Sequence, residues 1–287
     1  MTRAAVLLVL LAACLFGAVS GLRVGLLADP LLTNQKVEEP IDSYEGYEGG
    51  GALMARLLED GEHTISTVDS VEDEETWSQV LSTVSVFVFP AVNQGMVVSG
   101  FSEAVTQALN TFMEEGGVIV WSSSSVLCNQ TFQLGWAAPT ITWDLNSDKT
   151  PDATGTPFEA APETLEALRA SEFVFTGTVD QVCYYTINTI CTVMSVSRGE
   201  GHLVFLGWDF VSVDPDEPSK RDLITPKWEQ VFAIAVEGFT KEEADPSSSS
   251  SADGDDGSNS SNNSSGDDGA EDGDDGSAAN TLRSLFL

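Results

Sequence analysis

Short apolar runs alternate with amphipathic segments through the first half of the chain. The apolar runs have the length of strands that are covered on both faces, and one segment alternates as a half-buried strand does. The expected strands are residues 22–28, 63–68, 85–90 and 118–121. Apolar positions at three- and four-residue spacing predict the intervening helices, which are residues 50–61, 69–84 and 99–117. This β-α-β-α-β-α-β order predicts a parallel sheet with helices on both faces.

The second half of the chain is less regular. Residues 180–210 are expected to form a β-hairpin, a glycine-marked turn and a last core strand, and residues 225–239 an amphipathic closing helix. Residues 161–170 are expected to form a small helix, and residues 172–177 are typical of a strand. Residues 130–158 are expected to be mostly loop, with one short helical turn. The predicted class is α/β, a three-layer sandwich with a mostly parallel, flavodoxin-like sheet and a C-terminal β-hairpin.

The first 21 residues have the pattern of a secretory signal peptide. Arg3 precedes an apolar run that is shorter than the ~20 residues of a membrane span, and small residues then allow cleavage after Ser20 or Gly21. Cleavage at this place predicts a secreted protein without a membrane anchor, found outside the cell or in the secretory lumen. An uncleaved anchor is the alternative.

The C-terminal segment, residues 242–287, is predicted to be a disordered acidic tail. Residues 242–280 contain no Val, Ile, Leu, Met or aromatic residue, and "GDDG" occurs three times. Such a segment cannot bury enough apolar surface to offset the entropy of ordering. Its Asp-rich units lack the spacing of an EF-hand, so we expect at most weak Ca²⁺ association, and an inert solubilising tail is the alternative. The remaining residues, 22–241, form one domain.

The acidity extends to the domain itself. Of the 45 acidic residues, 12 lie in 242–280, which leaves 33 in the domain. Of the 12 basic residues, Arg3 and Arg283 lie outside the domain, which leaves 10. The net charge of the domain is therefore −23. Nucleic acid and anionic membranes are poor partners for such a surface. Cations, basic proteins, or mineral and glycan surfaces are more compatible partners, although the charge can also serve solubility alone.

Three cysteines remain after signal removal, which suggests one disulfide and one thiol in an oxidising compartment. Cys183 and Cys191 flank "YYTINTI", and a turn at Thr186–Asn188 would place them opposite each other in a hairpin. We predict that this pair is bonded and that Cys128 is a free thiol, buried or semi-buried. Two unpaired core cysteines are the alternative.

Four serines, Ser122–Ser125, follow the predicted strand at 118–121 and raise the question of a nucleophile. A serine needs an adjacent base, and the only histidines, His63 and His202, lie at predicted strand starts. The elbow Gly-x-Ser-x-Gly is absent, and Cys128 has no basic neighbour in sequence. We therefore predict no catalytic residue and no cofactor; the serines would cap the following short helix. A hydrolase using Ser122–Ser125 or Cys128 is the alternative function.

Two further kinds of site are suggested by the sequence. N-glycosylation sequons stand at Asn129, Asn259, Asn262 and Asn263. Aspartates that follow predicted strands could bring carboxylates to one rim as metal ligands, with capping and turn roles as the alternative. These are Asp29, Asp144 and Asp209.

Five stretches carry a family resemblance. The apolar first strand, "FVFP" and the helix leading into "GGVIVW" resemble the class I glutamine amidotransferase-like (ThuA-like) superfamily, which has a flavodoxin-like fold. "SRGEGHLVFLGWDF" and "CNQTFQLGW" resemble motifs of its secreted, non-catalytic branch. A catalytic member would show a Gly-x-Cys-x-Gly elbow, which this chain lacks. The resemblance implies a secreted, non-catalytic binding or scaffold module.

Overall fold

The computed structural model of the 287-residue chain describes residues 21–29, 32–33, 50–92, 100–136, 140–172, 180–188, 190–208, 210 and 221–240. For residues 140–145, 167–172 and 221–225 it describes the backbone only. Almost all of the predicted signal peptide, residues 1–21, and all of the predicted tail, residues 242–287, lie outside these ranges.

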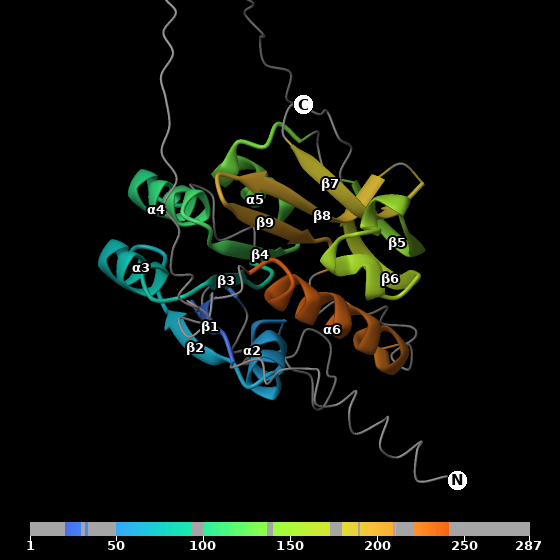
Figure 1. The fold of residues 1–287 in the computed structure, drawn as a ribbon, viewed down its shortest axis with the longest axis horizontal. Helices are drawn as coiled ribbons and strands as arrows, with labels where there is room; N and C mark the ends of the chain where they lie inside the picture. Colours follow the sequence, from blue (N-terminus) through green and yellow to red (C-terminus); the bar gives the residue numbers. More distant parts are fainter. Residues whose placement is uncertain are drawn as a thin grey trace, which may run out of the picture. The chain divides into compact units, whose positions relative to one another are not determined.

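A single nine-stranded sheet runs through the domain, with strand order β2-β1-β3-β4-β9-β8-β7-β5-β6 (Figure 1). The strands are β1 (Arg23–Leu27), β2 (Thr64–Val68), β3 (Val86–Phe89), β4 (Val118–Ser122), β5 (Thr140–Lys149), β6 (Thr164–Glu172), β7 (Gln181–Ile187), β8 (Ile190–Arg198) and β9 (Gly201–Leu206). The five strands from β2 to β9 are parallel, and β8, β7, β5 and β6 extend the sheet with antiparallel pairings. The predicted α/β class is confirmed.

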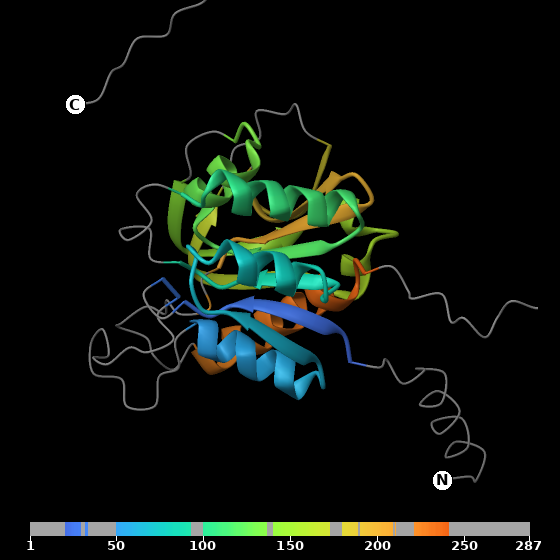
Figure 2. The same ribbon diagram turned by 90° about the vertical axis from the view of Figure 1, so that its left-hand side faces the viewer.

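Helices cover both faces of the sheet, which gives three layers (Figures 1 and 2). The helices are α2 (Gly50–Asp60), α3 (Glu74–Leu81), α4 (Glu103–Glu114), α5 (Ser125–Phe132) and α6 (Arg221–Glu237), with short 3-10 helices η1 (Pro151–Ala153) and η2 (Pro157–Ala160). Helices α2 and α6 pack on one face, and α3, α4 and α5 pack on the other. No helix in the described part of the chain has the length and apolar character that a bilayer span requires.

Alternating side chains of the buried strands fill two separate cores. In β3, Val86 and Val88 point into the core under α2 and α6, whereas Phe87 and Phe89 point into the core under α3, α4 and α5. Successive strand residues face opposite sides of a sheet, so a strand buried on both faces must be apolar throughout. This is the physical reason that the continuous apolar runs of the sequence became central parallel strands.

Two predicted elements are wrong, and a third, the helix predicted at 69–84, forms with different bounds. Residues 161–170 were expected as a helix, but β6 forms there, and β5 occupies ten residues of the expected loop at 130–158. Pairing with β5 through eight residue pairs outweighs the helix propensity of "LEALRA", because strand formation depends on cross-strand neighbours. Helix α3 begins at Glu74, five residues after the predicted start at Asp69. Its N-cap is Asp73, whose side chain accepts the Thr76 N–H at 3.2 Å.

Candidate functional site

The candidate site lies at the carboxyl end of β4, where four serines connect this strand to α5. Ser122 is the last residue of β4, and Ser125 is the first of α5. Ser123 and Ser124 both adopt the left-handed conformation, with φ of 49°. Such values cost about 1–2 kcal/mol for residues other than glycine, so surrounding contacts must hold this turn in place.

The hydroxyls of Ser122 and Ser124 form structural hydrogen bonds. Ser122 Oγ donates to the Trp208 carbonyl at 2.6 Å, which ties the end of β4 to the residues after β9. Ser124 Oγ donates to the Val92 carbonyl at 2.9 Å and accepts the Val92 N–H at 3.0 Å. Both serines are buried. These contacts join three segments that lie far apart in the sequence.

The expected capping role of the serines is not observed at the N-cap. Ser124 occupies the N-cap position of α5, but its side chain makes no capping hydrogen bond. Its hydroxyl is directed to Val92 instead, which is 32 residues away in the sequence. Spacing within "WSSSS" could not reveal this partner, because Val92 reaches the turn only through the pairing of β3 with β4.

Aromatic side chains form the base of the turn. Trp121 stacks on Phe89 with ring centroids 4.2 Å apart and meets Phe132 of α5 edge-to-face at 5.8 Å. The indole N–H of Trp121 has no hydrogen-bond partner in the described residues, and the same holds for Trp77. Each indole meets Phe101 edge-to-face, an arrangement in which aromatic quadrupoles attract. The site therefore rests on a packed aromatic support.

Cys128 lies on the buried side of α5 and is a free thiol, as predicted. Its surroundings remove it from water, and this desolvation raises the pKa of the thiol well above its ordinary value. The thiolate is the nucleophilic form of cysteine, so burial suppresses the reactivity of this residue.

Both histidines lie at the amino end of the parallel strands, whereas the serines lie at the carboxyl end. His202 pairs in register with Val118 at the start of β4, whereas Leu206 pairs with Ser122 at its end. Val118 and Ser122 are four residues apart along β4, so His202 and Ser122 are separated by about 13 Å along the strand direction. A proton cannot pass directly from Ser122 to His202 over this distance.

His63 is likewise held at the amino end of the parallel strands. Its Nδ1 accepts the Leu22 N–H at 3.2 Å, and its Nε2 lies 3.5 Å from Glu237 Oε1. The following residue, Thr64, pairs with Arg23 at the start of β1. His63 thus links β1, β2 and α6 and is remote from the strand-end serines.

One serine–histidine pair does form, but elsewhere. Ser197 Oγ lies 3.4 Å from His202 Nδ1 across the β8–β9 hairpin. Desolvation lowers the pKa of His202. Within the described ranges no carboxylate hydrogen-bonds to His202, so the third member of a catalytic triad is not found there. The pair could not be foreseen from sequence without the hairpin register.

The stretch "CNQTFQLGW" forms a clamp around one backbone unit. Asn129 Oδ1 accepts the Trp136 N–H at 3.1 Å, and Asn129 Nδ2 donates to the Trp136 carbonyl at 3.2 Å. The intervening chain turns through Gln133 and Gly135, which both have positive φ. The Trp136 indole then donates to Gln181 of β7 at 3.2 Å. This family-like motif therefore has a structural role, tying α5 to the antiparallel half of the sheet.

The clamp bears on the predicted glycosylation of Asn129. A glycan would occupy the same Nδ2 atom that donates to Trp136, and Thr131 of the sequon donates its hydroxyl to the Leu127 carbonyl at 2.8 Å. Modification of Asn129 stays a prediction. The sequons at Asn259, Asn262 and Asn263 lie outside the described residues.

The glycines of "SRGEGH" also have a structural reason. The turn between β8 and β9 packs against the carboxyl end of α4, where the Glu200 N–H donates to the Glu114 carbonyl at 3.2 Å. A Cβ on Gly201 would lie 2.1 Å from the Gly117 carbonyl oxygen, and one on Gly199 would lie 2.5 Å from the Glu114 Cα. Only glycine permits this close approach, which also leaves the last carbonyls of α4 with hydrogen-bond partners.

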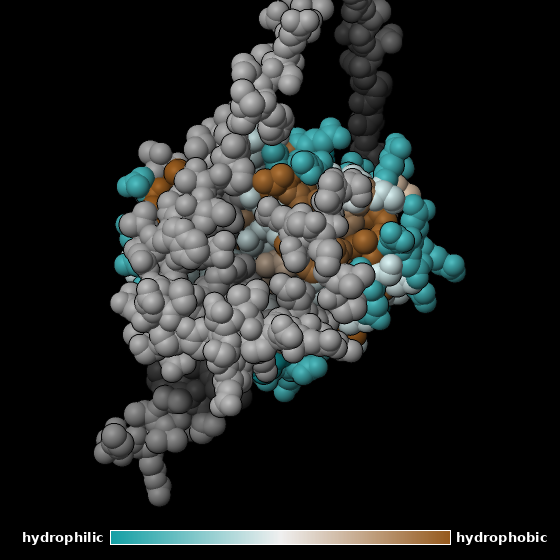
Figure 3. All heavy atoms as spheres, turned by 180° about the vertical axis from the view of Figure 1, so that it is seen from behind, coloured by the Kyte–Doolittle hydropathy of each residue, from teal (hydrophilic) through white to brown (hydrophobic). Residues whose placement is uncertain are grey.

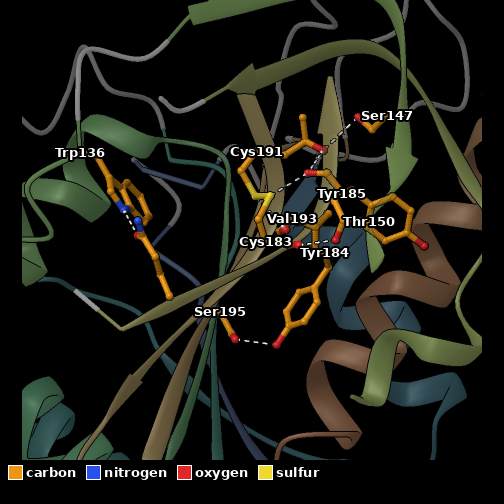
Figure 4. The surroundings of a disulfide bond; sticks show 11 residues. Trp136, Ser147, Thr150, Cys183, Tyr184, Tyr185, Cys191, Val193 and Ser195 are labelled. Atoms are coloured by element: carbon orange, nitrogen blue, oxygen red, sulfur yellow. Dashed lines mark hydrogen bonds between the residues drawn. A yellow bond between two sulfur atoms is a disulfide. The ribbon is translucent and has the colours of Figure 1, made fainter. Parts of the chain in front are cut away.

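Cys183 and Cys191 are joined by a disulfide, as predicted, with their Cα atoms 5.8 Å apart (Figure 4). The hairpin turn differs from the expected one, because Ile187 pairs with Ile190. In the resulting register Cys183 lies opposite Met194, and Cys191 lies opposite Thr186. The two cysteines are therefore not opposite each other, and another feature must bring them together.

That feature is an irregularity in the β7–β8 pairing around Tyr185. Tyr184 and Tyr185 are consecutive, yet both belong to the core under α2 and α6. Cys183 and Cys191 both belong to the opposite core. In a regular strand pair of this register the two cysteines would face opposite sides of the sheet, because side chains alternate. The irregularity changes the alternation and places both sulfurs on one side.

Backbone groups at this irregularity are satisfied by neighbouring segments. The Tyr184 carbonyl accepts the Thr150 N–H at 2.9 Å, and the Cys183 carbonyl accepts the Thr150 hydroxyl. The Thr192 carbonyl accepts the Gly207 N–H at 2.7 Å. Because buried polar groups without partners are costly, these bonds stabilise the distorted hairpin.

Two of the three rim aspartates, Asp29 and Asp144, lie far apart in the sheet. Asp29 is buried, and its Oδ2 accepts the Val71 N–H at 3.3 Å, which is a turn role. Asp144 lies inside β5 rather than after a strand, and β5 is six strand positions from β1, or about 29 Å. A site shared by Asp29 and Asp144 is thereby excluded, and Asp209 lies outside the described residues. No group of three or more metal-ligating side chains occurs within the described ranges.

Comparison with known proteins finds solved structures of low identity with TM-scores below 0.5. No protein-family model matches the sequence, and no curated protein matches it. A cytoplasmic protein of Salmonella typhimurium LT2 is 9% identical with a TM-score of 0.48, and the match covers 75% of this chain and 99% of that one. A ThuA-like protein of Bacteroides uniformis ATCC 8492 is 9% identical with a TM-score of 0.43, over 76% and 91%.

A third solved structure is a longer enzyme. The exo-beta-1,4-mannosidase of Opitutaceae bacterium strain TAV5 is 15% identical with a TM-score of 0.44, over 75% of this chain and 36% of that one. At such identities and TM-scores no residue role and no activity passes from these proteins to this chain.

Proposed function

We propose that this chain is a secreted, non-catalytic binding or scaffold module on an amidotransferase-like fold. The observation that carries the proposal is the state of the strand-end groups. The hydroxyls of Ser122 and Ser124 bind backbone atoms of Trp208 and Val92, and Cys128 is buried. Both histidines lie at the amino end of the parallel strands, away from these groups. A nucleophile without a base in reach is a poor catalyst.

The surface suggests the chemistry of the partner. Among the described residues Val126 is the one exposed large hydrophobic residue, with 39% of its surface accessible to solvent. In Figure 3 hydrophilic residues gather along the margins of the face shown, and hydrophobic residues lie nearer its middle. With a domain charge of −23 from the sequence, recognition by charge and hydrogen bonding fits a basic protein or a cation better than an apolar partner. Mineral and glycan surfaces remain within this proposal.

A secretory location is part of the proposal. A disulfide is typical of an oxidising compartment, and the pair of Cys183 and Cys191 supports such a location. The apolar leader after Arg3 supports the same route.

Chemical labelling tests the absence of catalysis. We expect that neither a fluorophosphonate nor an iodoacetamide probe modifies the native protein within minutes, because Ser122 and Ser124 are engaged and Cys128 is buried. The same iodoacetamide should modify Cys128 fully after denaturation, which serves as the control. Rapid stoichiometric modification of one serine in the native protein would instead establish the hydrolase alternative.

The acidic tail is proposed to bind Ca²⁺ weakly at several sites. Flexible carboxylates concentrate divalent cations electrostatically, and this attraction is screened over about 8 Å at physiological salt. Deleting residues 242–287 should abolish the binding in isothermal titration calorimetry and leave the melting temperature of the domain unchanged. If the truncated domain binds Ca²⁺ as well as the full chain does, the tail is only a solubiliser.

A further inference from the structure

Strand β2 is one edge of the nine-stranded sheet, and among the described residues its only strand partner is β1. Figure 1 shows β2 beside β1 at this end of the sheet. The Thr64 N–H donates to the Leu22 carbonyl, and the Val68 carbonyl accepts the Ala28 N–H. Because backbone groups of a parallel strand alternate in direction, Thr64, Ser66 and Val68 face β1. The N–H and C=O groups of Ile65 and Thr67 therefore point away from the sheet.

Within the described residues, β2 itself lacks the proline, the charged side chain and the bulge that often protect an edge strand. Its sequence, "TISTV", contains no proline and no charged residue, and its five residues pair with β1 without a register shift. Natural edges are commonly closed by lysine, proline or a bulge. The strand offers about 16 Å of regular backbone, enough for an added strand of about five residues.

Carboxylates surround both ends of β2. Glu59, Asp60 and Glu62 are exposed before the strand, and the exposed acids after it include Asp69 and Glu72. Residues 50–92 contain eight acidic residues and one Lys or Arg, which is Arg56. Arg56 pairs with Asp60 at 3.4 Å. Such an edge repels a second copy of itself and attracts a cationic chain.

We propose that the β2 edge binds an extended, Lys- or Arg-containing segment of a basic protein, which adds to the sheet as one further strand. This inference rests on the proposed binding function and gives it a surface and a partner class. Hydrogen bonds to Ile65 and Thr67 supply the pairing, and the flanking carboxylates select a basic sequence. The open backbone edge and the charge of its surroundings are independent features of the structure.

A defined probe makes the proposal testable. The probe is the peptide acetyl-Lys-Thr-Val-Thr-Val-Lys-amide, added to the ¹⁵N-labelled full chain in 50 mM NaCl. We expect the amides of Ile65 and Thr67 to shift and to gain protection from hydrogen exchange. The amides of Ser66 and Val68 already face β1, so they should change little and serve as internal controls.

Two variants separate strand addition from general charge attraction. Thr67→Pro removes an outward N–H and no bond to β1, so the domain should stay folded while peptide affinity falls about tenfold or more. Thr67→Ser keeps the N–H and should bind as the wild type does. A peptide that is N-methylated at its central residues should also lose about tenfold in affinity, because it cannot complete the strand pairing.

The charge component has a matched control. A double variant that carries Glu62→Gln and Glu72→Gln should bind the peptide about fivefold to tenfold more weakly. Asp152→Asn with Asp180→Asn changes the net charge equally, but these residues lie near β7, six strand positions or about 29 Å from β2. That distance exceeds the screening length, so affinity should change less than about twofold.

Several outcomes would overturn the inference. The β2 edge is not the site if millimolar peptide leaves Ile65 and Thr67 unchanged, or if Thr67→Pro and N-methylation have no effect. If the peptide binds elsewhere on the chain, the proposed binding function is still supported, but the β2 edge is rejected as its site. Covalent labelling of a strand-end serine would refute the non-catalytic function without bearing on the β2 result.

Discussion

Replacing Gly201 with alanine is expected to destabilise the domain by about 3 kcal/mol or more. The added Cβ would lie 2.1 Å from the Gly117 carbonyl oxygen and 2.5 Å from the Met113 carbonyl oxygen. Both contacts are with backbone, so no side-chain rotation relieves them, and the β8–β9 turn must move away from α4. Denaturant unfolding followed by circular dichroism measures the loss. Gly199→Ala should show a similar loss, because it adds left-handed strain at φ 59° to a backbone clash.

Gly155 provides the matched control for this prediction. It has a positive φ of 74° as Gly199 does, but a Cβ there would meet nothing within 4 Å. Gly155→Ala should therefore cost only the backbone term, about 1 kcal/mol. If Gly155→Ala and Gly199→Ala destabilise the domain equally, the close packing of the turn on α4 contributes nothing, and the structural explanation of the "GEG" motif is wrong.

Loss of the disulfide is expected to lower the free energy of unfolding by about 2.6 kcal/mol. Cys183 and Cys191 are separated by eight positions, so the bond closes a loop of nine residues, and chain entropy gives this magnitude. For a domain of this size the loss corresponds to a fall in melting temperature of about 5–10 °C. Scanning calorimetry of the Cys183→Ala/Cys191→Ala variant measures it.

The strand irregularity adds a second readout. The sulfurs share one face only because the pairing shifts around Tyr185, so removing the bond should loosen Tyr184 and Tyr185 and alter the near-ultraviolet circular dichroism. Dithiothreitol should reproduce both changes in the wild type and do nothing to the double variant. A peptide map that shows Cys128 crosslinked to either partner would refute the assignment.

Much of the parallel half of the fold could be predicted from the sequence. The runs that became β1, β3 and β4 are apolar except for Arg23 at the start of β1 and Ser122 at the end of β4, because their side chains enter both cores. Helix α4 was recognisable from apolar residues at helical spacing, of which Val105, Leu109 and Phe112 are buried. The cysteine pairing was also correct, although the turn assumed for it was not.

The antiparallel extension was not predictable in the same way. Strand β6 has the local composition of a helix and is stabilised as a strand by β5 and by contacts with α6, where the Trp228 indole donates to the Glu166 carbonyl at 3.0 Å. Partners of this kind are distant in sequence, and a single segment carries no record of them.

By itself the sequence determined the α/β class, the central strands, most helices and the absence of a glycine elbow at Ser122–Ser125, because each depends on local periodicity or on residues next to one another. Only the tertiary structure decided the role of that loop. Ser122 meets Trp208 across 86 positions, Ser124 meets Val92 across 32, and the register of β9 on β4 sets His202 at the far edge. These relations arise from long-range hydrogen bonds and strand order, which form only when the whole sheet is assembled.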